Sequence, residues 1–295
     1  MESIPYEIRG AERRHGTTKI EWTEATWNWM IGCTPVSAGC KNCYAMRMAF
    51  RCAEMGQEPY RGLTTPGPRG PVWTGVIREN SDTVVYRPLG WRAPRLIFVN
   101  SMSDVFHPNA PDWLREIGFD IMLEAPQHRY QVLTKRPDLI APYLARSGRR
   151  IPDSVWLGAT VEDERVAERV DHLRAAPARV RFLSVEPMTR RLGRIDLSGI
   201  HWVITGGESG PGRRRIDPEW VREVRDVCAE QGVAFFHKQW GHWSDNPLLA
   251  RCPAGEPPAE WIKRVDPHGK GGAILDGVLW REFPERLDHQ AALAA

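Results

Sequence analysis

Three cysteines fall close together, as Cys33-x6-Cys40-x2-Cys43, and they are the residues best suited to chemistry in this chain. Thiolates grouped this closely usually hold a metal ion or an iron–sulfur cluster. A structural zinc site or an ordinary cluster is closed by a fourth protein ligand, whereas three thiolates leave one metal position for another molecule. The spacing therefore predicts a metal centre on Cys33, Cys40 and Cys43 with one open coordination position.

The composition sets the class of protein to which this centre belongs. The 295 residues include 40 Lys and Arg against 37 Asp and Glu, a net charge of +3, which neither demands nor excludes nucleic acid. No apolar run is long enough to span a membrane, and residues 1–16 lack the apolar core of a signal peptide. We expect a cytoplasmic protein with no membrane partner, where thiols stay reduced and metal binding is favoured over disulfides. The scattered Cys52, Cys228 and Cys252 are interpreted as core or bystander residues.

Apolar strands alternate with amphipathic helices after the cysteines. The predicted strands are 26–31, 72–77, 95–100, 130–134, 155–160, 180–185, 201–205 and 234–238, and the predicted helices are 44–55, 111–125, 137–146, 163–175 and 218–231. This alternation indicates an α/β fold with a parallel sheet. Eight strands suffice for a closed, TIM-barrel-like (β/α) barrel. The first two strands have the weakest pattern, so an open barrel of six or seven strands is the alternative.

Three segments follow from this pattern. Residues 1–18 form a polar leader, residues 19–240 form the barrel, and residues 241–295 form a small C-terminal appendage. Within the appendage, Asp276-Gly277 between apolar residues predicts a hairpin over 273–280.

Polar residues follow nearly every predicted strand. In a parallel barrel such residues meet at one mouth, together with the cysteines. The candidates for binding a cofactor or substrate are Asp104, Lys135, Glu186, Gly206, Gly207 and Glu208. Glycines after a strand let a ligand approach the backbone, and the Glu208 carboxylate can hold an ammonium or hydroxyl group. A tight turn with a capping glutamate explains Gly206, Gly207 and Glu208 equally well, and Asp104 and Glu186 are alternatively ion-pair partners of Lys135 and Arg136. No residue is assigned a catalytic role.

The cysteine motif at the start of a βα barrel resembles the radical S-adenosylmethionine (SAM) superfamily. The resemblance implies a [4Fe–4S] cluster on the three cysteines, with SAM on the fourth iron, and reductive cleavage of SAM to a 5′-deoxyadenosyl radical. It also implies a reductase or other electron donor as partner. This chain departs from the superfamily pattern, because the common spacing is C-x3-C-x2-C and the usual aromatic residue before the third cysteine is replaced by Asn42. Its Gly-Gly-Glu also follows a late strand.

A second resemblance covers most of the chain. The stretches that carry it are 20–23, 32–44, 72–75, 98–107, 133–137, 182–187, 206–212 and 238–241. These are similar to a family of bacterial and phage proteins of unknown function, grouped loosely with radical-SAM barrels. Because some radical-SAM relatives repair or modify nucleic acid, the resemblance makes nucleic acid a candidate substrate.

Two other functions are compatible with the sequence. In the first, the cysteines bind zinc together with His107 or another group, and the protein recognises nucleic acid or a protein partner without catalysis. In the second, a barrel hydrolase uses the carboxylates and the cysteines are structural, although no nucleophile–base motif supports it. Arg213-Arg214-Arg215 would meet phosphate or form a solvated basic face.

Overall fold

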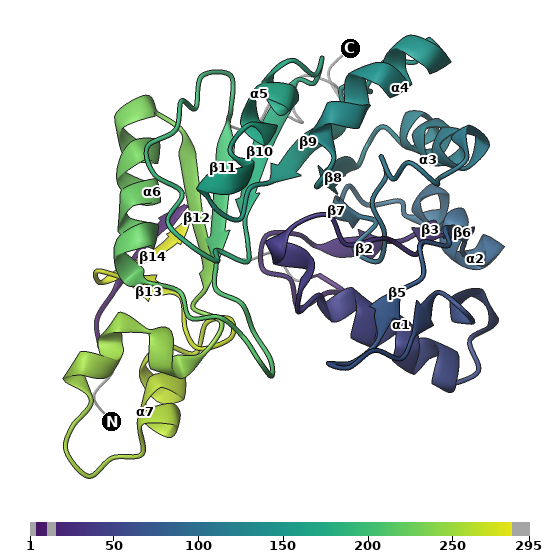
Figure 1. The fold of residues 1–295 in the computed structure, drawn as a ribbon. Helices are drawn as coiled ribbons and strands as arrows, with labels where there is room; N and C mark the ends of the chain where they lie inside the picture. The colour runs from purple at the N-terminus through teal and green to yellow at the C-terminus, as the bar shows by residue number, and fades with distance from the viewer. Residues whose placement is uncertain (1–3, 11–15, 285–295) are drawn as a thin grey trace.

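The chain folds as a mixed α/β protein around one large, mostly parallel sheet. The structure, a computed structural model, describes residues 4–10 and 16–284. The strands of the sheet are β1 (Glu7–Gly10), β2 (Ala25–Trp27), β7 (Leu96–Val99), β8 (Arg129–Thr134), β9 (Val155–Thr160), β10 (Val180–Val185), β11 (Trp202–Gly206), β12 (Ala234–Gln239), β13 (Ile274–Leu275) and β14 (Val278–Arg281). Their order is β1-β14-β12-β11-β10-β9-β8-β7-β2, with β13 beside β14. Strands that follow one another from β7 to β12 are therefore neighbours in the sheet (Figure 1).

Helices connect most of these strands. They are α1 (Tyr44–Glu54), α2 (Asp82–Val85), α3 (Asp112–Glu124), α4 (Ile140–Ser147), α5 (Arg169–Arg174), α6 (Pro218–Gln231) and α7 (Pro258–Val265). Helix α6 begins as predicted, because the Asp217 carboxylate accepts a hydrogen bond from the Glu219 N–H and Pro218 stands at the first turn. Within the described ranges, no helix combines the length and apolar character needed to cross a bilayer.

The two faces of the sheet bury different side chains. One face packs against α3 to α6 through aliphatic strand residues such as Val132, Leu157 and Val203. The other face, called here the inner face, carries an aromatic cluster that includes Trp22, Phe182 and Trp202. Because side chains alternate along a strand, this inner face continues at the carboxyl ends with Lys135 and Glu186, one residue beyond β8 and β10, and with Lys238 near the end of β12.

Close packing on both faces explains two glycines. A Cβ on Gly158 would lie 2.4 Å from the Phe182 ring, so β9 can run beneath that ring only as glycine. A Cβ on Gly118 of α3 would lie 2.2 Å from the ring of Trp29, whose indole N–H donates to the Leu114 carbonyl at 2.8 Å. These contacts fix α3 and β9 against their neighbours.

Two predicted strands differ from the structure. The segment predicted as strand 72–77 is wrong as a member of the parallel sheet, because β5 (Val72–Trp73) pairs antiparallel with β4 (Thr64–Thr65) in a separate ribbon. The turn between β4 and β5 is rich in Gly and Pro, which favours a local hairpin over distant pairing. Predicted strand 26–31 is divided, since β3 (Met30–Ile31) leaves the sheet and pairs with β6 (Arg78–Glu79).

Both terminal segments contribute to the main sheet. The predicted hairpin is confirmed, with β13 and β14 antiparallel around Asp276-Gly277. Strand β14 also pairs antiparallel with β12, and β1 pairs parallel with β14. Strand β1 in the leader and the pairing of β14 with β12 were not predicted from the sequence pattern. Residues 1–3, 11–15 and 285–295 of these segments lie outside the described residues.

Candidate functional site

The three clustered cysteines lie on one loop, residues 33–43, called here the cysteine loop. It leaves β3 and ends at Cys43, the residue that precedes α1, as the sequence predicted. A short 3-10 helix, Ala38–Cys40, turns the loop back. All three thiols are half-buried, and none is in a disulfide.

Two buried glutamates fasten the cysteine loop to the carboxyl ends of the sheet. Glu162, after β9, accepts a hydrogen bond from the Gly39 N–H at 3.0 Å, and Arg169 donates to its other oxygen at 2.9 Å. Burial favours the neutral form of Glu162, but hydrogen bonds and the charges of Lys135 and Arg169 outweigh it and lower the pKa. The carboxylate that holds Gly39 is therefore ionised at neutral pH.

Glu208, after β11, is the second fastening. It accepts hydrogen bonds from the Asn42 amide at 2.9 Å and from the Arg214 backbone N–H at 2.8 Å, and the Arg214 guanidinium is 2.6 Å from its other oxygen. The same guanidinium donates to the Ala38 carbonyl at 2.8 Å. Burial acts against ionisation, yet these donors lower the pKa of Glu208. Both oxygens of Glu208, a predicted cofactor-binding residue, are thus occupied. One oxygen binds the cysteine loop at Asn42, and the other binds Arg214, which in turn holds Ala38.

Asp104, after β7, organises the start of the loop. It accepts hydrogen bonds from Thr134 Oγ1 at 2.7 Å, the Lys135 N–H at 3.0 Å and Arg136 Nη1 at 2.9 Å. Arg136 in turn reaches Cys33 Sγ at 3.9 Å. Burial first, and then the Asp104 charge, raise the pKa of the Cys33 thiol to about 12, while Arg136 acts in the opposite direction. Asp104 consequently positions Arg136, and its oxygens are occupied by protein donors.

His107, proposed as a zinc ligand, is fully buried with both ring nitrogens engaged. Its Nε2 lies 2.8 Å from Thr34 Oγ1, and its Nδ1 accepts the Asn109 N–H at 3.1 Å. Because Nδ1 is an acceptor, Nε2 carries the proton and donates to Thr34. This arrangement offers no free nitrogen to a metal ion.

Lys135 and Glu186 are the predicted residues that keep binding capacity. Lys135 Nζ donates to Thr160 Oγ1 at 3.1 Å and forms no ion pair in the part of the chain that the structure describes. Glu186 accepts from Lys238 Nζ at 2.5 Å, and both side chains are partly exposed. These groups present ammonium and carboxylate functions on the inner face, at the carboxyl ends of β8, β10 and β12.

Gly206 and Gly207 have packing roles. A Cβ on Gly206 would lie 3.2 Å from carbon atoms of Glu186, and a Cβ on Gly207 would lie 2.0 Å from the Trp240 carbonyl oxygen. Glycine therefore lets Glu186 lie across the end of β11 and lets the backbone of residue 240 approach.

The three adjacent arginines are all paired. Arg213 and Arg215 lie 2.6 and 2.9 Å from the buried Asp245 carboxylate, and Arg214 pairs with Glu208. Arg213 and Arg214 are half-buried in these ion pairs and hold the segment after β11, whereas the Arg215 side chain is largely exposed to solvent.

Iron–sulfur clusters take cysteine thiolates as ligands, so Cys33, Cys40 and Cys43 are the residues of this chain that would hold one. The three free thiols share one loop. Among the described residues, no group of three His, Cys, Asp or Glu side chains is arranged around a single metal ion.

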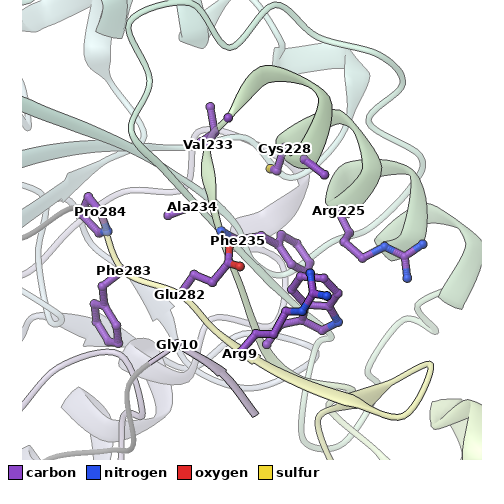
Figure 2. A pocket seen from close by; sticks show the side chains of 13 residues that line it. Arg9, Gly10, Arg225, Cys228, Val233, Ala234, Phe235, Glu282, Phe283 and Pro284 are labelled. Atoms are coloured by element: carbon purple, nitrogen blue, oxygen red, sulfur yellow. Dashed lines mark hydrogen bonds between the residues drawn. The ribbon is translucent and has the colours of Figure 1, made fainter. Parts of the chain in front are cut away.

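A groove of about 650 Å³ lies at the opposite, amino-terminal end of β12. Figure 2 shows Arg225 and Cys228 of α6 on one side and Arg9 and Glu282 on the other. The guanidinium carbons of Arg9 and Arg225 lie 5.0 and 5.9 Å from the Trp280 ring centre. The groove contains none of the predicted site residues, and we assign it no part in the candidate site.

Comparison with known families gives one match. Residues 17–284 match the family described as "Protein of unknown function (DUF5131)". The chain belongs to this family. No curated protein and no solved structure matches it. The predicted membership of an uncharacterised family is thus confirmed, and the DUF5131 match includes every strand of the main sheet except β1.

The sequence did not predict how the DUF5131 chain holds its cysteine loop. Glu162 follows a strand in a polar stretch that resembles an ordinary loop, Arg169 lies on a helix, and Asn42 and Arg214 are separated by 172 positions in the sequence. The place of these polar residues after apolar strands indicated a shared mouth but not these contacts. One pairing that the sequence offered, an ion pair of Asp104 with Lys135 or Arg136, is confirmed for Arg136 at 2.9 Å.

The buried His237, next to Lys238 on β12, is expected to make stability depend on pH. Its Nδ1 lies 2.9 Å from Thr205 Oγ1, and burial, followed by the Arg281 charge, lowers its pKa to about 3. The pKa of His237 in the folded protein lies below its unfolded value of about 6.5. Neutral His237 therefore contributes its full stability above pH 6.5, and this contribution is lost as the pH falls from 6.5 through the folded pKa. The free energy of unfolding of the wild type should fall between about pH 7 and 4.5. In His237→Gln, which has no titrating group at this position, we expect that fall to be smaller by roughly 2 to 3 kcal/mol.

Urea unfolding at a series of pH values measures this difference. His172→Gln, at an exposed position on α5, is the matched control and should follow the wild type. An identical pH dependence in His237→Gln and the wild type would contradict the assignment.

Proposed function

We propose that this protein is a radical-SAM-type enzyme that binds a [4Fe–4S] cluster on Cys33, Cys40 and Cys43. The observation that carries the proposal is the cysteine loop itself: three reduced thiols on one short segment, fastened to the sheet by Glu162, Glu208 and Arg136. A cluster bound in this way supplies an electron that cleaves SAM reductively, with a reductase or other electron donor as partner.

The chain's own residues would hold the cysteine loop and orient SAM. The Lys135 ammonium group has N–H donors beyond the one that binds Thr160, and these suit the SAM carboxylate. The Glu186 carboxylate suits the SAM ammonium group. Asp104 and Glu208 were predicted for the same task, but their oxygens are occupied, so we propose that they position the loop. Gly206 and Gly207 would then leave room beside Glu186 for the bound cofactor, because neither residue carries a side chain.

We propose further that the sheet is an open version of the (β/α) barrel. Consecutive parallel strands lie side by side from β7 to β12, and the connecting helices pack on one face, as in that fold. The substrate would enter at the carboxyl ends of these strands, above the aromatic inner face. Nucleic acid or a nucleotide is the candidate class, and the protein is expected to act in the cytoplasm.

Anaerobic purification tests the proposal. Iron, sulfide and zinc are measured first, and SAM with dithionite is then added and 5′-deoxyadenosine is sought by mass spectrometry. We expect about four irons per chain and formation of 5′-deoxyadenosine. Zinc without iron, together with intact SAM, would overturn the proposal and favour the zinc-binding alternative.

A further inference from the structure

Arg136 is a buried cation that faces one thiol of the cysteine loop. Only 5% of the residue is exposed. Its Nη1 donates to Asp104 Oδ2 at 2.9 Å and lies 3.9 Å from Cys33 Sγ, a distance at which an N–H can donate to sulfur. Its Nη2 donates to the Thr34 carbonyl at 2.9 Å and to Thr34 Oγ1 at 2.8 Å.

The guanidinium is therefore held in one orientation. Asp104, on one side, is itself fixed by Thr134 and by the Phe106 and Lys135 N–H groups. Thr34, on the other side, receives a second donor from His107. In the described ranges, neither Cys40 nor Cys43 has a charged donor to its sulfur, so the three thiols are unequal.

We propose that Arg136 is a positioning residue that fixes Cys33 and makes the cluster bound there easier to reduce; this inference depends on the proposed function. Hydrogen bonds to cluster sulfurs and nearby charge set the reduction potential of iron–sulfur clusters. Reduction adds one electron, supplied by the donor protein or by dithionite, and a cation at a ligand sulfur stabilises the more negative state. Without Arg136, the Asp104 carboxylate would be the nearest unbalanced charge, which would oppose reduction.

The test compares the midpoint potential of the cluster in the wild type, Arg136→Gln, Arg136→Lys and Arg115→Gln. Arg115 is the matched control, since it is equally buried and donates to the carbonyls of Val105 and His107 but touches no thiol. Protein is purified without oxygen, iron is counted, and the reduced cluster is recorded by electron paramagnetic resonance at a series of poised potentials.

We expect Arg136→Gln to shift the midpoint potential to a more negative value, Arg136→Lys to lie between it and the wild type, and Arg115→Gln to match the wild type. A wild-type midpoint in iron-loaded Arg136→Gln would overturn the inference. If Arg136→Gln folds but binds no iron, the inference is tested with Arg136→Lys instead. A midpoint potential more negative than that of the wild type supports the inference, and an unchanged midpoint potential overturns it. Wild-type protein without iron would instead overturn the proposed function.

Discussion

Replacement of Cys40 with alanine is expected to abolish formation of 5′-deoxyadenosine and to reduce iron well below the wild-type content. Cys40 ends the 3-10 turn of the cysteine loop, and Glu162 and Arg214 hold the backbone of the two residues before it, Gly39 and Ala38. With only Cys33 and Cys43 left, one iron of the cube would lose its protein ligand, and two thiolates do not retain such a cluster well. Iron analysis and mass spectrometry after addition of SAM and dithionite measure both effects.

Cys52→Ala is the control for this experiment. Cys52 is a half-buried free thiol on α1, the helix that begins directly after the cysteine loop, so it matches Cys40 in chemistry and neighbourhood. It should keep its iron and its activity. An iron-loaded Cys40→Ala protein that still cleaves SAM would refute the assignment of the metal ligands.

Replacement of Glu208 with glutamine is expected to weaken cluster retention and to destabilise the fold. The carboxylate holds Asn42 and Arg214, and Arg214 holds Ala38, so one charge fastens two points of the cysteine loop. Removing one partner of a buried ion pair costs about 3–5 kcal/mol, and the partly exposed Arg214 places the loss near 3 kcal/mol. Loss of such an outer-shell contact lowers metal affinity by about 10–100-fold.

Chemical unfolding and iron retention during chelator challenge measure the two effects. Glu223→Gln is the matched control. Glu223, on α6, forms an ion pair with Arg191 through two hydrogen bonds, and this pair does not contact the cysteine loop. The alternative role, in which Glu208 binds SAM directly, predicts that Glu208→Gln keeps its iron and stability and loses only SAM affinity. That result would show that the fastening role is wrong.

Much of the fold could be predicted from the chain's apolar pattern. Strands β8, β9 and β10 are short apolar runs bounded by polar turns, and α3 and α6 have helical periodicity with recognisable ends. Each of these signals is local, because burial of a strand or helix face selects apolar residues at a fixed period. The hairpin at Asp276-Gly277 is equally local, since the turn chemistry determines the pairing.

The strand assigned to the wrong sheet and the strand that was not predicted have different causes. Val72–Trp73 has the composition of a strand, but its partner is decided by the nearby turn to Thr64–Thr65. Glu7–Gly10 is exposed and polar, and it becomes a strand only because β14 offers it a parallel edge. Pairing between distant segments leaves no periodic mark on either segment alone.

By itself, the sequence determined the cysteine loop, its place before a helix, and the polar ends of the strands. Only the tertiary structure decided what each polar end does. Asp104 and Glu208 are occupied by Arg136 and Arg214, whereas Lys135 remains available to a ligand. The reason is physical: a residue type fixes which hydrogen bonds and charges a side chain can offer, but the partner that takes them comes from whichever strand or loop the fold brings within contact distance.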